Sequence, residues 1–151
     1  MVRRMSQDHA ALLNGMQKGW DAAMGIRYLR ATLDELEAEI VVSDIHHQQY
    51  GLVHGGVYAG WIETLCSAGA AMNAMAKGQS GAVGLENATS FLKAVREGTL
   101  RAIARPLTRG RRTQVWEAEI RDGAGALVAQ GKVRLMNLER GEKAGGAEVS
   151  P

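Results

Sequence analysis

A single carboxylate stands inside the longest apolar segment of the chain. From Gly51 to Ala76 the residues are small or apolar almost throughout, and Glu63 is the only charged one when histidine is counted as neutral. A carboxylate in such surroundings loses hydration, so it requires a polar pocket, a partner or a catalytic task. Ala59 and Ser67, four residues before and after Glu63, would share its helix face and leave room for a ligand. The alternative is that Glu63 simply points into solvent.

Paired glycines precede this carboxylate. His54-Gly55-Gly56 would lie at a helix N-terminus, where unpaired amides and the positive end of the helix dipole favour negative charge. Glycine allows a close approach of the backbone, so an amide of Gly55 or Gly56 could stabilise the oxyanion formed in acyl transfer. Glu63, two turns further on, would attack the acyl group or activate water.

The elements that must position these residues follow from the hydrophobic periodicity. The segment from Gly56 to Ala76 lacks proline and precedes Lys77-Gly78, which predicts one long helix buried against a sheet. Alternating residues predict a strand over Asp34–Ser43, and a short helix is expected over Leu12–Met24. Four more strands, with a hairpin turn at Arg121–Gly125, are predicted over Val83–Leu92, Thr99–Leu107, Arg112–Arg121 and Ala126–Met136. This pattern predicts an α+β fold in which an antiparallel sheet, its strands in hairpin succession, wraps around the long helix.

The size and composition of the chain indicate one domain. The chain has 151 residues, of which 46% are hydrophobic, enough for a single core. We expect one domain over residues 1–138, with residues 1–10 mobile at its start and residues 139–151 forming a mobile tail. Cys66 is the only cysteine, and no apolar signal core or membrane-length run occurs, so a cytoplasmic protein without a membrane partner is expected.

The positive charge of the chain is concentrated in one region. From Lys93 to Arg121 there are eight basic and three acidic residues, a net charge of +5. This charge suits a multiply charged anionic ligand, although solvated strand faces would explain it equally well. Aromatic residues make up only 5% of the chain and no nucleic-acid-binding motif accompanies the arginines, so nucleic acid is not expected as a partner.

Several motifs, taken in order, resemble those of the hotdog-fold acyl-CoA thioesterases. They are Gly51-Leu52-Val53-His54-Gly55-Gly56, the acidic Glu63, Val83-Gly84-Leu85-Glu86-Asn87, Arg96-Glu97-Gly98 and Gly110-Arg111-Arg112-Thr113-Gln114-Val115-Trp116. The resemblance extends from about Met24 to Leu138. It is strongest to the subgroup of the Arthrobacter-type 4-hydroxybenzoyl-CoA, dihydroxynaphthoyl-CoA and phenylacetate-degradation thioesterases. Ala88 stands where related sequences often carry His or another polar residue.

The resemblance implies a role for each of five residues. Glu63 would be the catalytic nucleophile or general base, and the Gly55 amide would polarise the thioester carbonyl. Gln48 would place the thioester or the attacking water, His54 would hydrogen-bond near the thioester, and Ser67 would support the carboxylate or the water. Neither role of Glu63 needs a metal, and coenzyme A is part of the substrate rather than a cofactor. The sequence shows no cluster with zinc-ligand spacing.

The implied substrate suggests phosphate-binding residues and an oligomer. Arg109, Arg111 and Arg112 at the turn entering the third long strand, with Lys93 and Arg96 in the preceding loop, would bind the phosphates of coenzyme A. The acyl pocket of such folds forms between two subunits. A sheet on one helix also leaves an open edge and apolar surface, so a dimer, or a tetramer made of two dimers, is expected.

Other functions are compatible with the same residues. A hotdog hydratase or dehydratase could use His54 and Glu63 on the substrate carbons, and a non-catalytic module could bind acyl-CoA without turnover. An aryl or otherwise bulky acyl group is suggested by the resemblance alone. Tyr50, Tyr58 and Trp61 could line the acyl pocket or could pack in the core.

Overall fold

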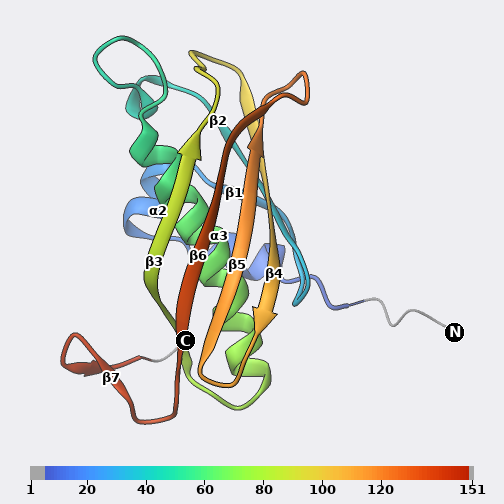
Figure 1. Cartoon of the computed structure of the whole chain (residues 1–151), viewed down its shortest axis with the longest axis vertical. Helices are drawn as coiled ribbons and strands as arrows, with labels where there is room; N and C mark the ends of the chain where they lie inside the picture. Colours follow the sequence, from blue (N-terminus) through green and yellow to red (C-terminus); the bar gives the residue numbers. More distant parts are fainter. Residues whose placement is uncertain (1–5, 150–151) are drawn as a thin grey trace, which may run out of the picture.

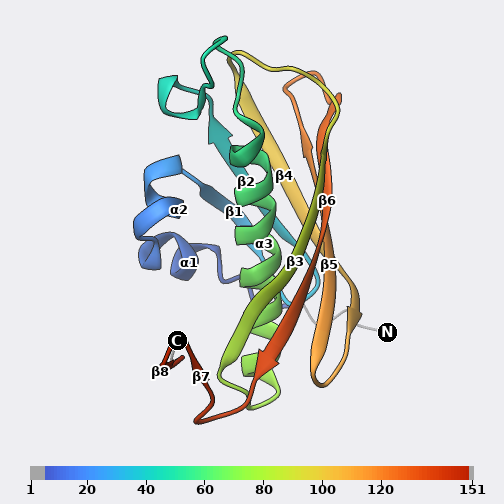
Figure 2. The same ribbon diagram turned by 60° about the vertical axis from the view of Figure 1, so that its left-hand side comes forward.

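The computed structural model describes residues 6–149, which form an antiparallel sheet around one long helix. The strands are β1 (Arg27–Ala31), β2 (Leu36–Val41), β3 (Gly81–Phe91), β4 (Thr99–Arg109), β5 (Thr113–Arg121) and β6 (Leu127–Leu138). The helix α3 (Gly55–Ala76) lies in the hollow of this sheet (Figure 1). Two short helices, α1 (Ala10–Met16) and α2 (Gly19–Met24), lie on the side of α3 opposite β5 and β6 (Figure 2). The predicted α+β hotdog architecture is confirmed.

The core forms where α3 meets the sheet, as its apolar sequence predicted. Trp61, Ile62 and Leu65 of α3 are completely buried, and so is Trp116 of β5. Gly69 brings the two elements close, because a Cβ at this position would lie 2.6 Å from two ring carbons of Trp116. Small residues on α3 thus let the sheet close tightly over it.

The order of the strands differs from the predicted hairpin succession. The sheet runs β1-β2-β4-β5-β6-β3, so β3 pairs with β6 and not with β4, the next strand in the chain. β4 pairs with β2 on one side and with β5 on the other, which leaves it no free edge for β3. The succession holds only for β4, β5 and β6. As a result β3 lies at an edge of the sheet, with α3 behind it.

The N-terminal helical segment is also different from its prediction. The single helix expected over Leu12–Met24 is divided into α1 and α2. Gln17, at the break, has extended backbone, and its side-chain nitrogen donates a hydrogen bond of 2.7 Å to the carbonyl of Ile26. A contact between residues nine apart in sequence thus replaces the helical continuation. β1 and the 3-10 helix η1 (Asp44–His46) were not predicted either.

Asp8 fastens α1 to the sheet. One of its carboxylate oxygens accepts hydrogen bonds of 2.9 Å from the amides of Ala10 and Ala31. The hydrogen bond from Ala10, followed by that from Ala31, lowers the pKa of the Asp8 carboxyl below its ordinary value of 3.8. The ionised form is therefore the one that the folded chain favours.

This carboxylate makes the attachment of α1 dependent on pH. Because the folded pKa is lowered, the stabilisation is complete above about pH 5 and is lost as the pH falls through the folded pKa. We expect the amide proton shifts of Ala10 and Ala31, followed by NMR, to titrate in acid. Asp8→Asn, which keeps an acceptor oxygen but cannot ionise, should abolish this titration. An unchanged titration in that variant would assign it to another group.

The chain beyond β6 forms a small hairpin. β7 (Lys143–Ala144) pairs with β8 (Ala147–Glu148), so residues of the expected mobile tail have a defined local structure, while their mobility stays a prediction. Part of that expectation, for residues 1–5 and 150–151, lies outside the described residues. No helix within residues 6–149 is long and apolar enough to cross a membrane.

Candidate active site

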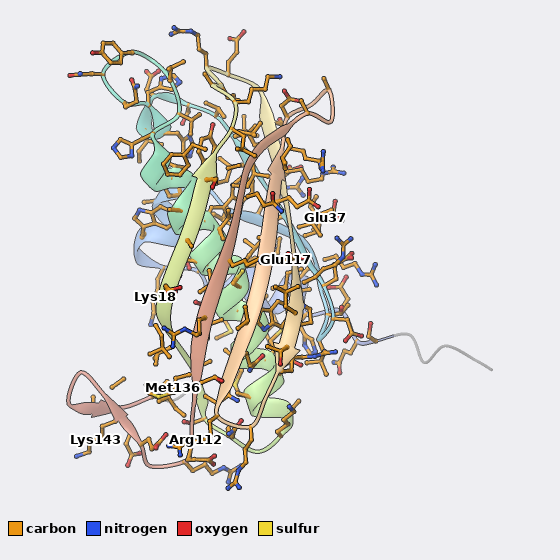
Figure 3. All side chains as sticks on the ribbon, viewed as in Figure 1. Lys18, Glu37, Arg112, Glu117, Met136 and Lys143 are labelled. Carbon is orange, nitrogen blue, oxygen red and sulfur yellow. The ribbon has the colours of Figure 1, made fainter. Side chains whose placement is uncertain are left out.

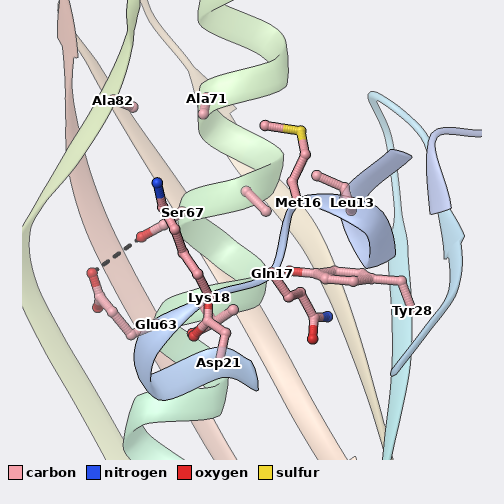
Figure 4. Close-up of a pocket in the computed structure, with 12 residues that line it drawn as sticks. Leu13, Met16, Gln17, Lys18, Asp21, Tyr28, Glu63, Ser67, Ala71 and Ala82 are labelled. Carbon is pink, nitrogen blue, oxygen red and sulfur yellow. Dashed lines mark hydrogen bonds between the residues drawn. The ribbon is translucent and has the colours of Figure 1, made fainter. Parts of the chain in front are cut away.

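The side chain of Glu63, a residue of α3, points toward β3 and is not fully exposed to solvent. The Ser67 hydroxyl, one turn further along α3, donates a hydrogen bond of 3.2 Å to Glu63 Oε1 (Figure 4). From β3, Asn87 Nδ2 donates a hydrogen bond of 3.1 Å to Glu63 Oε2. Each carboxylate oxygen therefore has its own donor. The predicted pairing of Glu63 with Ser67 on one helix face is confirmed.

A cavity of about 450 Å³ opens beside this carboxylate (Figure 4). Glu63, Ser67 and Ala71 of α3 form part of its wall, while Met16 and Lys18 come from the α1–α2 segment. Its volume lies within the range of small-molecule sites, about 300–1,000 Å³. Each oxygen of the Glu63 carboxylate accepts a hydrogen bond, and the carboxylate lies at the wall of the cavity. It can therefore act on a ligand bound inside.

Polar groups also reach this cavity from α2 and β1. Asp21 accepts a hydrogen bond of 2.7 Å from the Thr64 hydroxyl, which fastens α2 to α3 next to Glu63. Burial, and secondarily the charge of Asp21, raises the pKa of Tyr28 well above its ordinary value. The Tyr28 phenol in the cavity wall is consequently neutral and able to donate a hydrogen bond.

At the N-terminus of α3 the structure distinguishes between the two glycines. His54 is the N-cap residue, and its Nδ1 accepts a hydrogen bond of 2.8 Å from the Gly56 amide. The amide of Gly55 donates to no acceptor within the described part of the chain. Of the two candidate amides, that of Gly55 is therefore available to an incoming oxygen. Because Nδ1 accepts, the ring proton of a neutral His54 is on Nε2.

The capping bond gives His54 a structural task that can be measured. His54→Ala should lower the free energy of unfolding by about 1 kcal/mol, because the Gly56 amide loses its acceptor. His54→Asn, which restores a good capping oxygen, should recover most of this loss. Urea unfolding monitored by circular dichroism would compare the three proteins. Equal midpoints for wild type and His54→Ala would contradict the capping role.

Gln48 lies near this helix terminus. Its side-chain oxygen accepts a hydrogen bond from the Tyr50 amide, which leaves the side-chain nitrogen free to donate. Gln48 and Gly55 line a second cavity, of about 290 Å³, together with Phe91 and Lys93. Trp61 is a core residue, and Tyr50 is 70% exposed. Tyr58 is buried and also lines this second cavity, and its burial raises its pKa to about 12.

The five predicted catalytic residues form two groups within one chain. Gly55, His54 and Gln48 lie at the N-terminus of α3, and Glu63 and Ser67 lie further along it. Eight residues separate Gly55 from Glu63, which corresponds to about 12 Å along a helix. Within one chain, the Gly55 amide and the Glu63 carboxylate therefore lie too far apart to act on the same bond of a substrate.

The structure also separates the five cations expected to bind phosphate. Lys93 and Arg96 follow β3 near the N-terminus of α3, whereas the three arginines of the β4–β5 turn lie at the other end of this helix (Figure 1). Since α3 has 22 residues, its ends are about 33 Å apart. The two sets cannot serve as one cluster within a single chain.

Most of these cations already have partners. Lys93 forms an ion pair with Asp122, and its hydrogen bond lowers the pKa of that carboxyl. Arg96 donates a hydrogen bond of 2.8 Å to the carbonyl of Tyr50, and Arg109 pairs with Asp34 at 2.7 Å.

Arg111 and Arg112 differ in this respect. Neither makes a salt bridge with any of residues 6–149. Both line a cavity of about 250 Å³ that also includes Glu139 and Glu142. Figure 3 shows Arg112 at the end of the sheet where the chain leaves β6. These two guanidinium groups are the cations of the set best able to receive an anion.

Asn87 is a member of the site that the sequence did not predict. Asn87 belongs to a quoted motif, but no role was assigned to it. A polar side chain on a strand next to the long helix was the available signal. The pairing of β3 had to be known before this side chain could be matched with Glu63. No group of three or more His, Cys, Asp or Glu side chains suited to a metal ion occurs in residues 6–149.

Comparisons with known proteins identify the family to which the chain is similar. Residues 50–129 match the model of the "Thioesterase superfamily". The chain is 37% identical over 135 residues to the "Putative esterase Rv1847" of Mycobacterium tuberculosis, covering 89% of this chain and 96% of that protein. It is 40% identical over 102 residues to the "Proofreading thioesterase EntH" of Cronobacter turicensis, covering 68% and 73% of the two chains. The crystal structure of thioesterase HI1161 from Haemophilus influenzae superposes with a TM-score of 0.80 at 26% identity, covering 92% and 96%.

Proposed function

Because this chain belongs to the thioesterase superfamily and is a thioester hydrolase, we propose that its substrate is an acyl-CoA carrying an aryl or otherwise bulky acyl group. The observation that supports this most is the Glu63 carboxylate, held by two donors at the wall of a cavity of about 450 Å³. The cavity would receive the acyl group. The products would be the free acid and coenzyme A.

Hydrolysis can proceed from this carboxylate in two ways. As a general base, Glu63 takes a proton from water while the water oxygen bonds to the thioester carbon. The carbonyl oxygen becomes an oxyanion, which the Gly55 amide stabilises, and the C–S bond then breaks and releases the thiolate. As a nucleophile, Glu63 forms a mixed anhydride with loss of the thiolate, and water then cleaves this anhydride. The thiolate takes up a proton in either case.

The spacing of Gly55 and Glu63 favours a site shared by two copies of the chain. The two residues of one chain are too far apart to act together, so the carboxylate of one copy would face the Gly55 amide of the other. The outer edge of β3 has no partner strand within the described residues. Leu85, Phe91 and Leu92, on or just after β3, are about half exposed. Pairing of this edge with a second copy would form a dimer and cover these side chains.

A dimer of this kind also affects the phosphate-binding cations. Antiparallel pairing of two β3 strands would bring the β4–β5 turn of one copy toward the α3 N-terminus of the other. Arg111 and Arg112 would then be the cations for the phosphates of coenzyme A. Since they lack ion-pair partners within the described chain, a phosphate would not displace an existing pair.

Substitution of these arginines should weaken substrate binding without changing the chemistry. Arg111→Ala combined with Arg112→Ala should raise KM for the CoA thioester about tenfold, with kcat unchanged, through loss of charge-assisted hydrogen bonds. KM for the corresponding acyl-pantetheine, which lacks the nucleotide phosphates, should stay the same. Steady-state thiol release measures both constants. An equal rise in KM for both substrates would exclude a role in phosphate binding.

The proposed substrate is tested by a thiol-release assay on a panel of esters. Benzoyl-, 4-hydroxybenzoyl-, phenylacetyl-, hexanoyl- and palmitoyl-CoA would be compared, and the aryl esters are expected to give the highest kcat/KM. A preference for palmitoyl-CoA would exclude the proposed acyl class. Binding of the esters without thiol release would indicate a non-catalytic module. An enoyl-CoA, whose conjugated double bond disappears on hydration without thiol release, would detect a hydratase.

A further inference from the structure

We infer that Asn87 is a positioning residue that fixes the reactive orientation of Glu63, an inference that rests on the proposed role of Glu63. Asn87 Nδ2 donates two hydrogen bonds, one of 3.1 Å to Glu63 Oε2 and one of 2.9 Å to the carbonyl of Ala59. Both acceptors belong to α3, one turn apart. A single amide group of β3 thus binds the backbone of the helix and the carboxylate that the helix carries.

The orientation of the Asn87 amide is itself determined by a neighbour. The Thr89 hydroxyl donates a hydrogen bond of 2.6 Å to Asn87 Oδ1. If the amide were turned over, its oxygen would face two acceptors and its nitrogen would face the hydroxyl, so the orientation with Nδ2 toward Glu63 is favoured. Thr89 therefore acts on Glu63 through Asn87.

The space for this arrangement depends on two glycines. A Cβ at Gly131 of β6 would lie 2.4 Å from the Thr89 hydroxyl oxygen, so the hydroxyl occupies room that a larger residue would fill. On β3, a Cβ at Gly84 would lie 2.2 Å from Glu63 Oε1. Glycine at these two positions of β3 and β6 thus leaves space for the Glu63 carboxylate and for the Thr89 hydroxyl.

Without Asn87 the carboxylate would be held by Ser67 alone. Glu63 has several rotatable side-chain bonds, and the Ser67 hydrogen bond of 3.2 Å restrains only Oε1. A reacting group displaced by about 1 Å can lose about 10²-fold in rate. Since Asn87 does not line the cavity beside Glu63, its loss should reduce kcat and leave KM unchanged.

The experiment replaces the donor with an acceptor of the same shape. Asn87→Asp keeps an oxygen for the Thr89 hydroxyl but directs a second carboxylate oxygen at Glu63. We expect kcat to fall about 10²-fold at constant KM. Thr89→Val should give a smaller fall, and Thr89→Ser, which keeps the hydroxyl, should restore the rate. Ser90→Ala is the matched control, because Ser90 is an exposed residue of β3 that makes no side-chain hydrogen bond with the described residues. Benzoyl-CoA and benzoyl-pantetheine would both be used as substrates.

A second measurement does not depend on activity. Urea unfolding midpoints of wild type, Asn87→Asp, Glu63→Gln and the double variant form a double-mutant cycle. Asn87→Asp should lower the midpoint more in the presence of Glu63 than in the Glu63→Gln background, where the repulsion between two carboxylates is absent. Equal effects in the two backgrounds would overturn the inference, as would an unchanged kcat or a change confined to KM. If the wild type hydrolysed benzoyl-pantetheine but not benzoyl-CoA, the acyl-CoA proposal would be overturned. The effect of Asn87→Asp on kcat would still be measured with benzoyl-pantetheine.

Discussion

Glu63→Gln is expected to lower kcat for thioester hydrolysis by about 10³- to 10⁴-fold, because the amide can neither accept a proton from water nor attack the thioester. The substitution preserves the shape of the side chain and an oxygen for the Ser67 hydroxyl, so the folded structure should persist. Thiol release under single-turnover conditions would measure the rate. Circular dichroism and the urea midpoint would confirm folding.

The matched control for this substitution is Glu86→Gln. Glu86 is an exposed acid on β3 whose contact with Arg134 is at 3.6 Å, and it should be replaceable with little effect on the rate. Full activity of Glu63→Gln on every ester that the wild type hydrolyses would eliminate the proposed mechanism. ¹⁸O found in Glu63 after a single turnover in H₂¹⁸O would establish attack by the carboxylate itself, because the label enters Glu63 only when water opens the mixed anhydride at the Glu63 carbonyl carbon.

Two inactive variants are expected to restore activity when their chains are mixed. Glu63→Gln lacks the carboxylate, and Gly55→Val would displace the amide because its side chain meets the ring of Phe91, which lies 2.5 Å from a Cβ at this position. If each site takes Gly55 from one copy and Glu63 from the other, a mixed dimer contains one intact site and one doubly altered site. Random reassociation in equal amounts should recover about a quarter of the wild-type activity.

The controls for this mixing experiment are each variant unfolded and reassociated alone, which should stay inactive. Native mass spectrometry of chains with different mass labels would show that mixed dimers form. Mixed dimers without recovered activity would rule out the shared site. A monomer at micromolar concentration would rule out the dimer as well.

The features that the sequence predicted correctly depend on local geometry. The spacing of four between Glu63 and Ser67 places both on one helix face whatever surrounds the helix, and their hydrogen bond is present. The paired glycines after His54 predicted the start of the helix for a similar reason. The structure adds that the amide of Gly56 is already hydrogen-bonded to His54, so the amide of Gly55 is the one available to a ligand. The antiparallel sheet around one helix also followed from the alternation of its segments.

The features that were not predicted depend on contacts distant in sequence. The pairing of β3 with β6 joins residues such as Phe91 and Ala129, and no local pattern specifies it. The role of Asn87 follows from this strand order, whereas the separation of Arg96 from Arg112 follows from the strand β4 that lies between them in the chain. The break between α1 and α2 has the same origin, because the side chain of Gln17 bonds to a residue beyond the helix.

The place of β3 in the sheet has a consequence for the time course of folding. β4, β5 and β6 are joined by short turns, whereas β3 can pair with β6 only after the chain between Phe91 and Leu127 has been ordered. Contacts that close so long a loop form slowly. With one partner strand, β3 is also the long strand whose amides should exchange with solvent first. When it opens, Asn87 and Gly84 move with it, so the carboxylate loses the Asn87 hydrogen bond and keeps only that of Ser67 while the core stays folded. A second copy paired with β3 would therefore protect the catalytic geometry against local opening.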